Sequence, residues 1–107
     1  MVKVELFKSK TFGYLGIRAI DHAEDSLVCS AVSNLLQGFY STLINIEEKP
    51  HLEKVIMQSG YFELEIRPME TDEERKVIDA LFFFVQVTLA QLNKKYPQYV
   101  DIIVNKS

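Results

Sequence analysis

The chain has 107 residues, of which 48% are hydrophobic and 25% are charged, and its formal net charge is −3. This composition fits one small globular domain with a single core, and it excludes wholesale disorder. An acidic chain without a Lys/Arg cluster is poorly suited to direct nucleic-acid binding, so we expect a basic peptide or protein as its partner.

Hydrophobic segments and the single cysteine bear on where the protein works. The longest unbroken apolar run, residues 80–85, is far shorter than the roughly 20 residues of a membrane span. The N-terminus has no apolar segment of the secretory type. One cysteine excludes an internal disulfide. We therefore expect a cytoplasmic protein without membrane association, whose fold depends on packing alone.

Two strands are predicted at the beginning of the chain. In residues 2–7 apolar and polar side chains alternate, which is the period of a half-buried strand. After a polar connection, residues 13–20 are predicted to form a second strand, with Leu15, Ile17 and Ala19 on one face. The two strands should pair as a hairpin.

From about Ser26 the apolar period becomes helical, which predicts a helix to about Ile46. Asp25 or Ser26 is the expected N-cap. Gly38 lies inside this helix, where glycine costs roughly 1 kcal/mol relative to alanine, so we expect another element to pack closely against it. The apolar positions with helical spacing are Val28, Val32, Leu35, Leu36, Phe39 and Leu43.

The second half of the chain repeats the order of hairpin and helix. Residues 54–58 and 62–67 are the predicted strands of a second hairpin. Residues 71–74 form a capping box that opens a second helix. This helix should end near Tyr96, because the proline that follows cannot continue it. A short last strand is expected at residues 100–104.

The predicted order ββαββαβ indicates the α+β class, with the whole chain, residues 1–107, as one two-layer domain. Both helices should pack on one face of a mostly antiparallel or mixed sheet. Charged residues at alternate strand positions should leave the other face of the sheet exposed to water.

The second predicted helix carries more apolar surface than a two-layer fold needs. Residues 81–85 place apolar side chains all round the helix, at about 100° per residue. A two-layer fold buries only one stripe of a helix, so we expect the surplus to face another subunit, most simply in a two-fold homodimer. In the alternative, one or two of the phenylalanines are half-exposed or cover the edge of the sheet.

A cysteine and a histidine flank the predicted start of the first helix. Cys29 would be the third helical residue if Ser26 is the N-cap, and the fourth if Asp25 is. Backbone N–H groups and the positive end of the helix dipole stabilise a thiolate there. His22 could form an ion pair with this thiolate or serve as general acid and base. The carboxylates of Glu24 and Asp25 oppose thiolate formation.

The same two residues also fit a structural role. A cysteine early in a helix is most often a small core residue, and a loop histidine is most often a surface side chain. One cysteine and two histidines are too few ligands for a metal site, so we expect no metal and no other cofactor. A redox sensor is disfavoured because the chain has no second cysteine to resolve a sulfenic acid.

The residues around Cys29 resemble the ribosomal-processing cysteine protease family Prp, also called YsxB-like. Members of this family have Gly-His-Ala, a short loop, and then Val-Cys-Ala-Ala-Val-Ser or a close variant. Here the motif stands as Asp21-His22-Ala23 and Val28-Cys29-Ser30-Ala31-Val32-Ser33. Residues 60–62 and 72–74, and Tyr96, also stand where the family has similar features, so the resemblance covers nearly the whole chain.

The resemblance implies a cysteine endopeptidase that removes a short N-terminal extension from a large-subunit ribosomal protein. It assigns Cys29 as the nucleophile and His22 as the base. Ser33 matches the family serine that lines the site and receives a supporting role, while Asp25 or Ser26 would lie near the family's loop acid. The N-terminus of the helix would form part of the oxyanion hole, with the backbone N–H of Cys29 as a donor.

The sequence departs from the family pattern at two points. Asp21 replaces the usual glycine and adds a negative charge beside His22, which favours the imidazolium. The loop between His22 and Cys29 is shorter than in many members, which suggests a more fixed site or a substrate gripped differently. The competing hypothesis is a non-catalytic dimeric module that binds a ribosomal protein or an assembly intermediate, with Cys29 as a buried helix residue.

Overall fold

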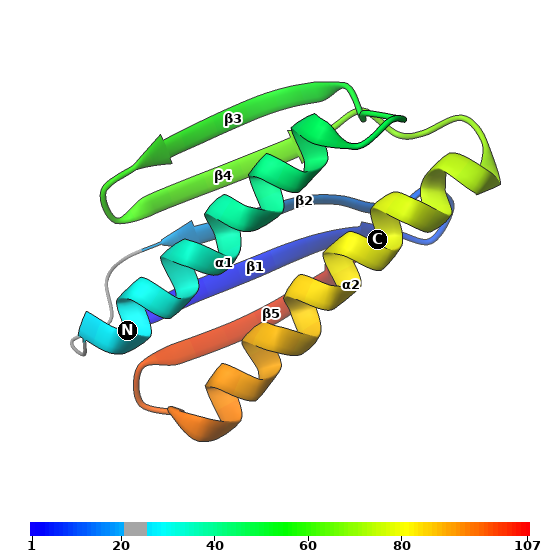
Figure 1. Cartoon of the computed structure of the whole chain (residues 1–107). Helices are drawn as coiled ribbons and strands as arrows, with labels where there is room; N and C mark the ends of the chain where they lie inside the picture. Colours follow the sequence, from blue (N-terminus) through cyan, green and yellow to red (C-terminus); the bar gives the residue numbers. More distant parts are fainter. Residues whose placement is uncertain (21–25) are drawn as a thin grey trace.

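The computed structural model of the chain describes residues 1–20 and 26–107, and of Ser26 it describes the backbone only. The described residues form five strands and two helices, which agree in number, type and order with the prediction (Figure 1). These elements are β1 (Val2–Ser9), β2 (Gly13–Ile20), α1 (Ser26–Asn45), β3 (Leu52–Gln58), β4 (Tyr61–Ile66), α2 (Asp72–Lys95) and β5 (Val100–Lys106).

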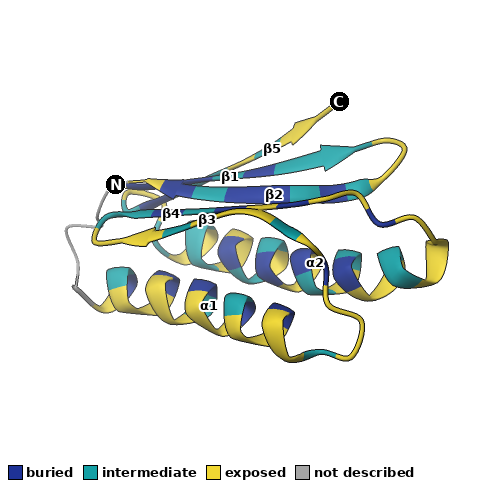
Figure 2. Ribbon diagram, turned by 90° about the horizontal axis from the view of Figure 1, so that it is seen from above, coloured by how far each residue is buried: buried dark blue, intermediate teal, exposed yellow. Residues whose placement is uncertain are grey.

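The strands form one open mixed sheet in the order β3-β4-β2-β1-β5. β1 pairs in parallel with β5, whereas the other neighbouring strands are antiparallel. Both helices lie on the same face of this sheet (Figure 2). The α+β two-layer architecture predicted from the sequence is therefore confirmed. β3 and β5 are the edge strands, and β3 lies on the α1 side of the sheet (Figure 1).

The core lies between the sheet and the two helices, and Phe82 of α2 is at its centre. Phe82 is fully buried. Its ring stacks on Tyr14 of β2, with the ring centroids 5.3 Å apart, and meets the edge of Phe39 of α1 at 4.8 Å. These contacts join both helices to the sheet, because each of the three rings comes from a different element.

A β-bulge changes which residue of β2 enters the core. Phe7 pairs with Gly16 and Lys8 pairs with Tyr14, so that Leu15 is an extra residue without a direct partner in the register. The extra residue reverses the alternation of side chains beyond it. Tyr14 is buried as a result, while Leu15 is only half-buried. The prediction that Leu15 shares the core face of Ile17 was wrong for this reason.

Helix boundaries agree closely with the expected signals. The Thr71 hydroxyl accepts a hydrogen bond from the Glu74 backbone N–H at 3.2 Å, which confirms the N-cap of α2. Tyr96 is the C-cap of this helix. The expectation for Gly38 was wrong, because a Cβ atom built on this residue meets nothing within 4 Å. Gly38 lies on an open part of the surface of α1.

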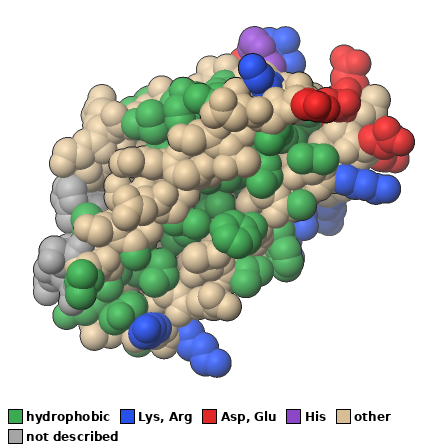
Figure 3. All heavy atoms as spheres, viewed as in Figure 1, with side chains coloured by type: hydrophobic (Ala, Val, Ile, Leu, Met, Phe, Trp, Pro, Cys, Tyr) green, Lys and Arg blue, Asp and Glu red, His purple; other side chains and the backbone are tan. Residues whose placement is uncertain are grey.

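The outer surface of the helical layer is rich in apolar side chains, which gather over α1 and α2 (Figure 3). By length and composition alone, the segments Leu27–Asn45 and Asp72–Lys95 are long and apolar enough to cross a membrane. Polar residues interrupt both segments, so neither is an unbroken apolar run. Each helix also buries one stripe against the sheet, as amphipathic core helices do.

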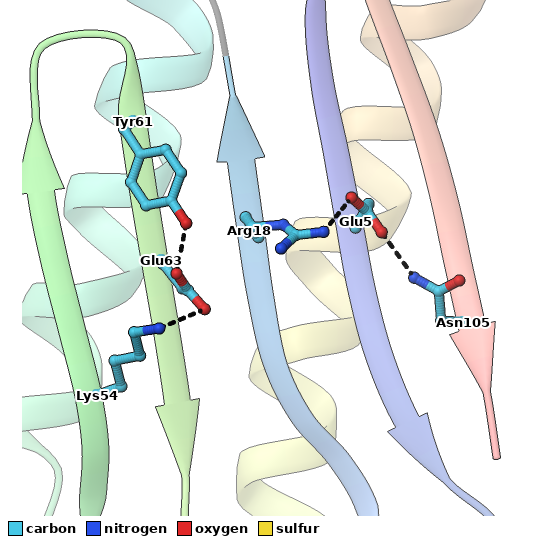
Figure 4. Close-up of polar contacts among 6 residues, drawn as sticks. All are labelled: Glu5, Arg18, Lys54, Tyr61, Glu63 and Asn105. Atoms are coloured by element: carbon cyan, nitrogen blue, oxygen red, sulfur yellow. Dashed lines mark hydrogen bonds and ion pairs between the residues drawn. The ribbon is translucent and has the colours of Figure 1, made fainter.

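The other face of the sheet carries polar clusters that bridge neighbouring strands (Figure 4). Arg18 of β2 donates to Glu5 of β1 at 2.7 Å, and Asn105 of β5 donates to the same carboxylate at 3.1 Å. The hydrogen bond from Arg18 is the largest cause that lowers the pKa of Glu5. On the adjoining strands, the Tyr61 hydroxyl donates to Glu63, and Lys54 forms an ion pair with it at 3.2 Å.

Candidate active site

Cys29 lies in the first turn of α1, where the helix meets the edge of a cavity. α1 is described from Ser26, so Cys29 is the fourth described residue of this helix. His22 and Asp25 lie outside the described residues, and their predicted roles are not tested by the structure.

The first turn of α1 provides an electropositive environment for the sulfur of Cys29. Cys29 lies three residues after Ser26, the residue from which α1 is described, so it belongs to the N-terminal part of the helix. The positive end of the helix dipole lies at the same place. Cys29 is half-buried and packs against the core beside the buried Val28 and Val32. Cys29 also lines a cavity beside α1.

A cavity of about 360 Å³ opens beside Cys29, between α1 and the β3–β4 hairpin. Its floor is apolar and comes from the core, including Val32, Leu36 and Phe62. Its far wall is the end of β3 and the turn into β4, residues 57–61. The cavity therefore combines the thiol side chain of Cys29 in its lining with an apolar pocket large enough for a side chain.

One flank of α1 supplies the polar wall of this cavity. Cys29, Ser33 and Gln37 follow one another at intervals of four residues, which places them on one side of the helix. The Gln37 amide donates a hydrogen bond to the Ser33 hydroxyl at 3.1 Å. The structure thus brings the predicted residues Cys29 and Ser33 to the same cavity.

The sequence interpretation did not include Gln37 or the residues of the β3–β4 hairpin. Gln37 could have been found, because it continues the four-residue spacing that joins Cys29 to Ser33. Met57 and Gly60 could not, because they reach the cavity only through the pairing of β4 with β2. That pairing joins residues that are far apart in the sequence.

Within residues 1–20 and 26–107, no group of three or more His, Cys, Asp or Glu side chains could hold a metal ion. His51, the histidine among these residues, lies at a different cavity, together with Arg67 and Glu74. The described lining of the cavity beside α1 contains the thiol of Cys29 and the hydroxyl groups of Ser33, Ser59 and Tyr61.

A two-layer α+β domain with a cysteine at the start of a helix, facing a cavity, defines a candidate cysteine protease. The family model described as cysteine protease Prp matches residues 1–101. The chain belongs to this family. The resemblance noted in the residues around Cys29 is thereby confirmed over nearly the whole chain. Comparison with curated proteins gave no match.

Solved structures share the whole fold at low sequence identity. SMU.848 from Streptococcus mutans has a TM-score of 0.78 and 17% identity, covering 100% of this chain and 96% of that chain. The ribosomal processing protease Prp from S. aureus, in complex with a covalently linked product peptide, has a TM-score of 0.75 and 19% identity. The same protease with a substrate peptide has a TM-score of 0.72 and 18% identity. Both S. aureus comparisons cover 100% of each chain.

Proposed function

We propose that this chain is a cysteine endopeptidase that removes the N-terminal extension of a large-subunit ribosomal protein during ribosome maturation. The observation that carries the proposal is the position of Cys29, in the first turn of α1 and at the edge of a cavity with an apolar floor. Membership of the cysteine protease Prp family supports the same reaction class. The reaction would take place in the cytoplasm, where thiols stay reduced.

In the proposed mechanism, the sulfur of Cys29 attacks the carbonyl carbon of the scissile peptide bond after His22 accepts its proton. The carbon–nitrogen bond then breaks, and His22 returns the proton to the departing amine. Water, deprotonated by His22, attacks the thioester that remains and releases the acid and the thiol. Backbone N–H groups of the first turn of α1, among them that of Cys29, would stabilise the negative charge on the carbonyl oxygen.

Two properties of the chain favour the N-terminal arm of a ribosomal protein as the substrate. Such arms are basic, and the chain carries a formal net charge of −3, which favours their association electrostatically. The apolar floor formed by Val32, Leu36 and Phe62 suits a large apolar side chain next to the scissile bond. The S. aureus ribosomal processing protease has been solved with a substrate peptide and with a product peptide, which supports a peptide ligand for this chain.

The proposal is tested by cleavage of a peptide that spans the N-terminal extension of the host's ribosomal protein. Cys29→Ala and His22→Ala should abolish cleavage while leaving the circular dichroism spectrum unchanged. Ser30→Ala is a matched control, because Ser30 is exposed in the same turn of α1 and does not line the cavity. Normal cleavage by Cys29→Ala would contradict the proposal.

Reaction with iodoacetamide at pH 6 tests the thiol without any substrate. A Cys29 activated by His22 should react much faster than a model thiol, and the His22→Ala variant should react more slowly. The alternative function is a non-catalytic module for ribosome assembly. It would be favoured if the wild-type protein bound the peptide without cleaving it, and if Cys29 reacted no faster than the model thiol.

A further inference from the structure

Ala19 of β2 has the smallest side chain in the hydrophobic core, and it lines the cavity beside Cys29. Every other member of the core that the described residues form is valine or a residue larger than valine. Ala19 exposes only 5% of its surface, so its small size is not explained by a position on the outside of the fold.

Ala19 lies in a row of side chains that crosses the sheet from strand to strand. It pairs directly with Val4 of β1 and with Phe62 of β4, and Phe62 pairs with Met57 of β3. Residues directly opposite one another in antiparallel strands project from the same face of the sheet. Because Ala19 and its two partners are buried, this is the face that carries the helices. Figure 2 shows both helices on that face.

The next row of the sheet shows what a larger residue does at the same place. Ile17 stands two residues before Ala19 on the same face of β2, and it pairs with Leu6 and Leu64. Ile17 is fully buried and does not line the cavity. Protein interiors are close-packed, so a shorter side chain leaves space wherever no neighbour fills it. The cavity therefore opens where the buried side chain of β2 is shortest.

A small residue in a sheet can also serve to let a helix approach closely. In that case the helix would fill the space above the alanine. Ala19 instead lines an open cavity of about 360 Å³ together with Cys29 and Val32 of α1. The space that the alanine leaves is thus part of the cavity, and it is available to a ligand.

We propose that Ala19 is a specificity-determining residue, whose small side chain sets how large an apolar side chain the cavity beside Cys29 accepts. This inference rests on the proposed peptidase function. It names the substrates of that function as peptides with a large aromatic or aliphatic side chain next to the scissile bond. A larger residue at position 19 would occupy the space that such a side chain needs, and it would leave the thiol of Cys29 in place.

Cleavage of two peptides that differ only in having Phe or Ala next to the scissile bond measures this selectivity. The wild-type protein should favour the Phe peptide in kcat/KM by at least about tenfold. Ala19→Leu should lower kcat/KM for the Phe peptide by at least about tenfold and change that for the Ala peptide by no more than about twofold. Ala19→Val should lie between the two, and it adds less volume to the core if Ala19→Leu unfolds the chain.

Ala90→Leu is the matched control, because Ala90 is exposed in α2 and does not line the cavity. It should leave the selectivity between the two peptides unchanged. Equal losses for both peptides in Ala19→Val and Ala19→Leu would overturn the inference, because they would assign Ala19 to packing alone. A wild-type protein that cleaves both peptides equally well would overturn it too.

Alkylation of Cys29 tests the cavity without cleavage, and so separates this inference from the proposed function. Iodoacetamide and N-benzyliodoacetamide both lose iodide to the sulfur, but only the second carries an apolar ring. Relative to the same two rates with glutathione, the benzyl reagent should react at least about fivefold faster with the wild-type protein, because its ring is buried in the cavity.

This advantage of the benzyl reagent should fall in Ala19→Val and disappear in Ala19→Leu, while the rate with iodoacetamide stays at the wild-type value. If this pattern appears and no peptide is cleaved, the proposed function is wrong and the role of Ala19 in sizing the cavity stands. If the benzyl reagent has no advantage in the wild-type protein, or keeps it in both variants, Ala19 does not size the cavity, even when peptides are cleaved.

Discussion

The Ser33 hydroxyl accepts a hydrogen bond from the Gln37 amide at 3.1 Å, and both residues line the cavity that contains Cys29. The bond holds two polar groups on one flank of α1 in a defined arrangement. Both side chains are exposed, so their contribution to folding is small. Their position favours a role in holding the substrate backbone rather than in the chemistry of the thiol.

Gln37→Ala should therefore raise KM for the peptide by about two- to tenfold and leave kcat nearly unchanged, because one hydrogen bond contributes about 0.5–1.5 kcal/mol. Alkylation of Cys29 should proceed at the wild-type rate. Asn34→Ala is the control, because Asn34 is exposed in α1 and does not line the cavity. A fall in kcat with no change in KM would assign Gln37 to the transition state instead.

Met57 is the half-exposed apolar residue at the end of β3 that forms part of the cavity wall, and 49% of its surface is accessible. Met57→Glu should lower kcat/KM at least about tenfold for peptides with a large apolar residue beside the scissile bond, because a carboxylate at this wall is desolvated on binding. Met57→Leu should retain activity, since it preserves the apolar surface. If Met57→Glu cleaves such peptides normally, the side chain of the substrate does not enter this cavity.

Gly38 offers a stabilising substitution in α1. A Cβ atom at this position meets nothing within 4 Å, so Gly38→Ala should increase the free energy of unfolding by about 0.5–1 kcal/mol through helix propensity. Gly16→Ala should have the opposite effect, because its Cβ would lie 2.8 Å from the backbone oxygen of Leu64 in the neighbouring strand. Urea denaturation of the two variants measures both changes. Destabilisation by Gly38→Ala would mean that this part of α1 is covered.

The Arg18–Glu5 pair predicts how the free energy of unfolding changes with pH. The hydrogen bond from Arg18 holds the pKa of Glu5 below the ordinary value of a glutamate side chain. A carboxyl group whose pKa is lower in the folded protein stabilises the fold above its unfolded pKa, and this stabilisation is lost as the pH falls through the folded value. The wild-type protein should therefore be more stable than Glu5→Gln at pH 7.

This difference between the wild-type protein and Glu5→Gln should shrink below about pH 4.5 and disappear once Glu5 is protonated. Both side chains are partly exposed, so the effect should also weaken as salt is added. Thermal denaturation of the two proteins between pH 2 and pH 7 provides the comparison. If the difference in stability between the two proteins does not change with pH, the charge of the Glu5 carboxylate is not its cause.

Local patterns determined most of the fold before any long-range contact was known. The alternation in residues 2–7, the helical spacing from Val28 to Leu43, and the capping box at Thr71 each depend on neighbours within a few residues. Elements specified by such local signals occur in the structure where they were predicted. The position of Cys29 near the start of α1 followed from the same signals, and so did its placement one turn before Ser33.

Only the tertiary structure decided the features that depend on pairing across the chain. The bulge opposite Phe7 turned Tyr14 rather than Leu15 into the core, because its position is set by the register between two strands. Gly38 lies on an open surface. The spacing of apolar residues shows which side of a helix is buried, but only the arrangement of the neighbouring elements shows whether another part of the chain covers a given position. The cavity wall at Met57 exists because β4 pairs with β2 and carries β3 alongside α1. A sequence pattern specifies which face of an element is apolar, whereas the partner of that face is chosen by contacts between distant segments.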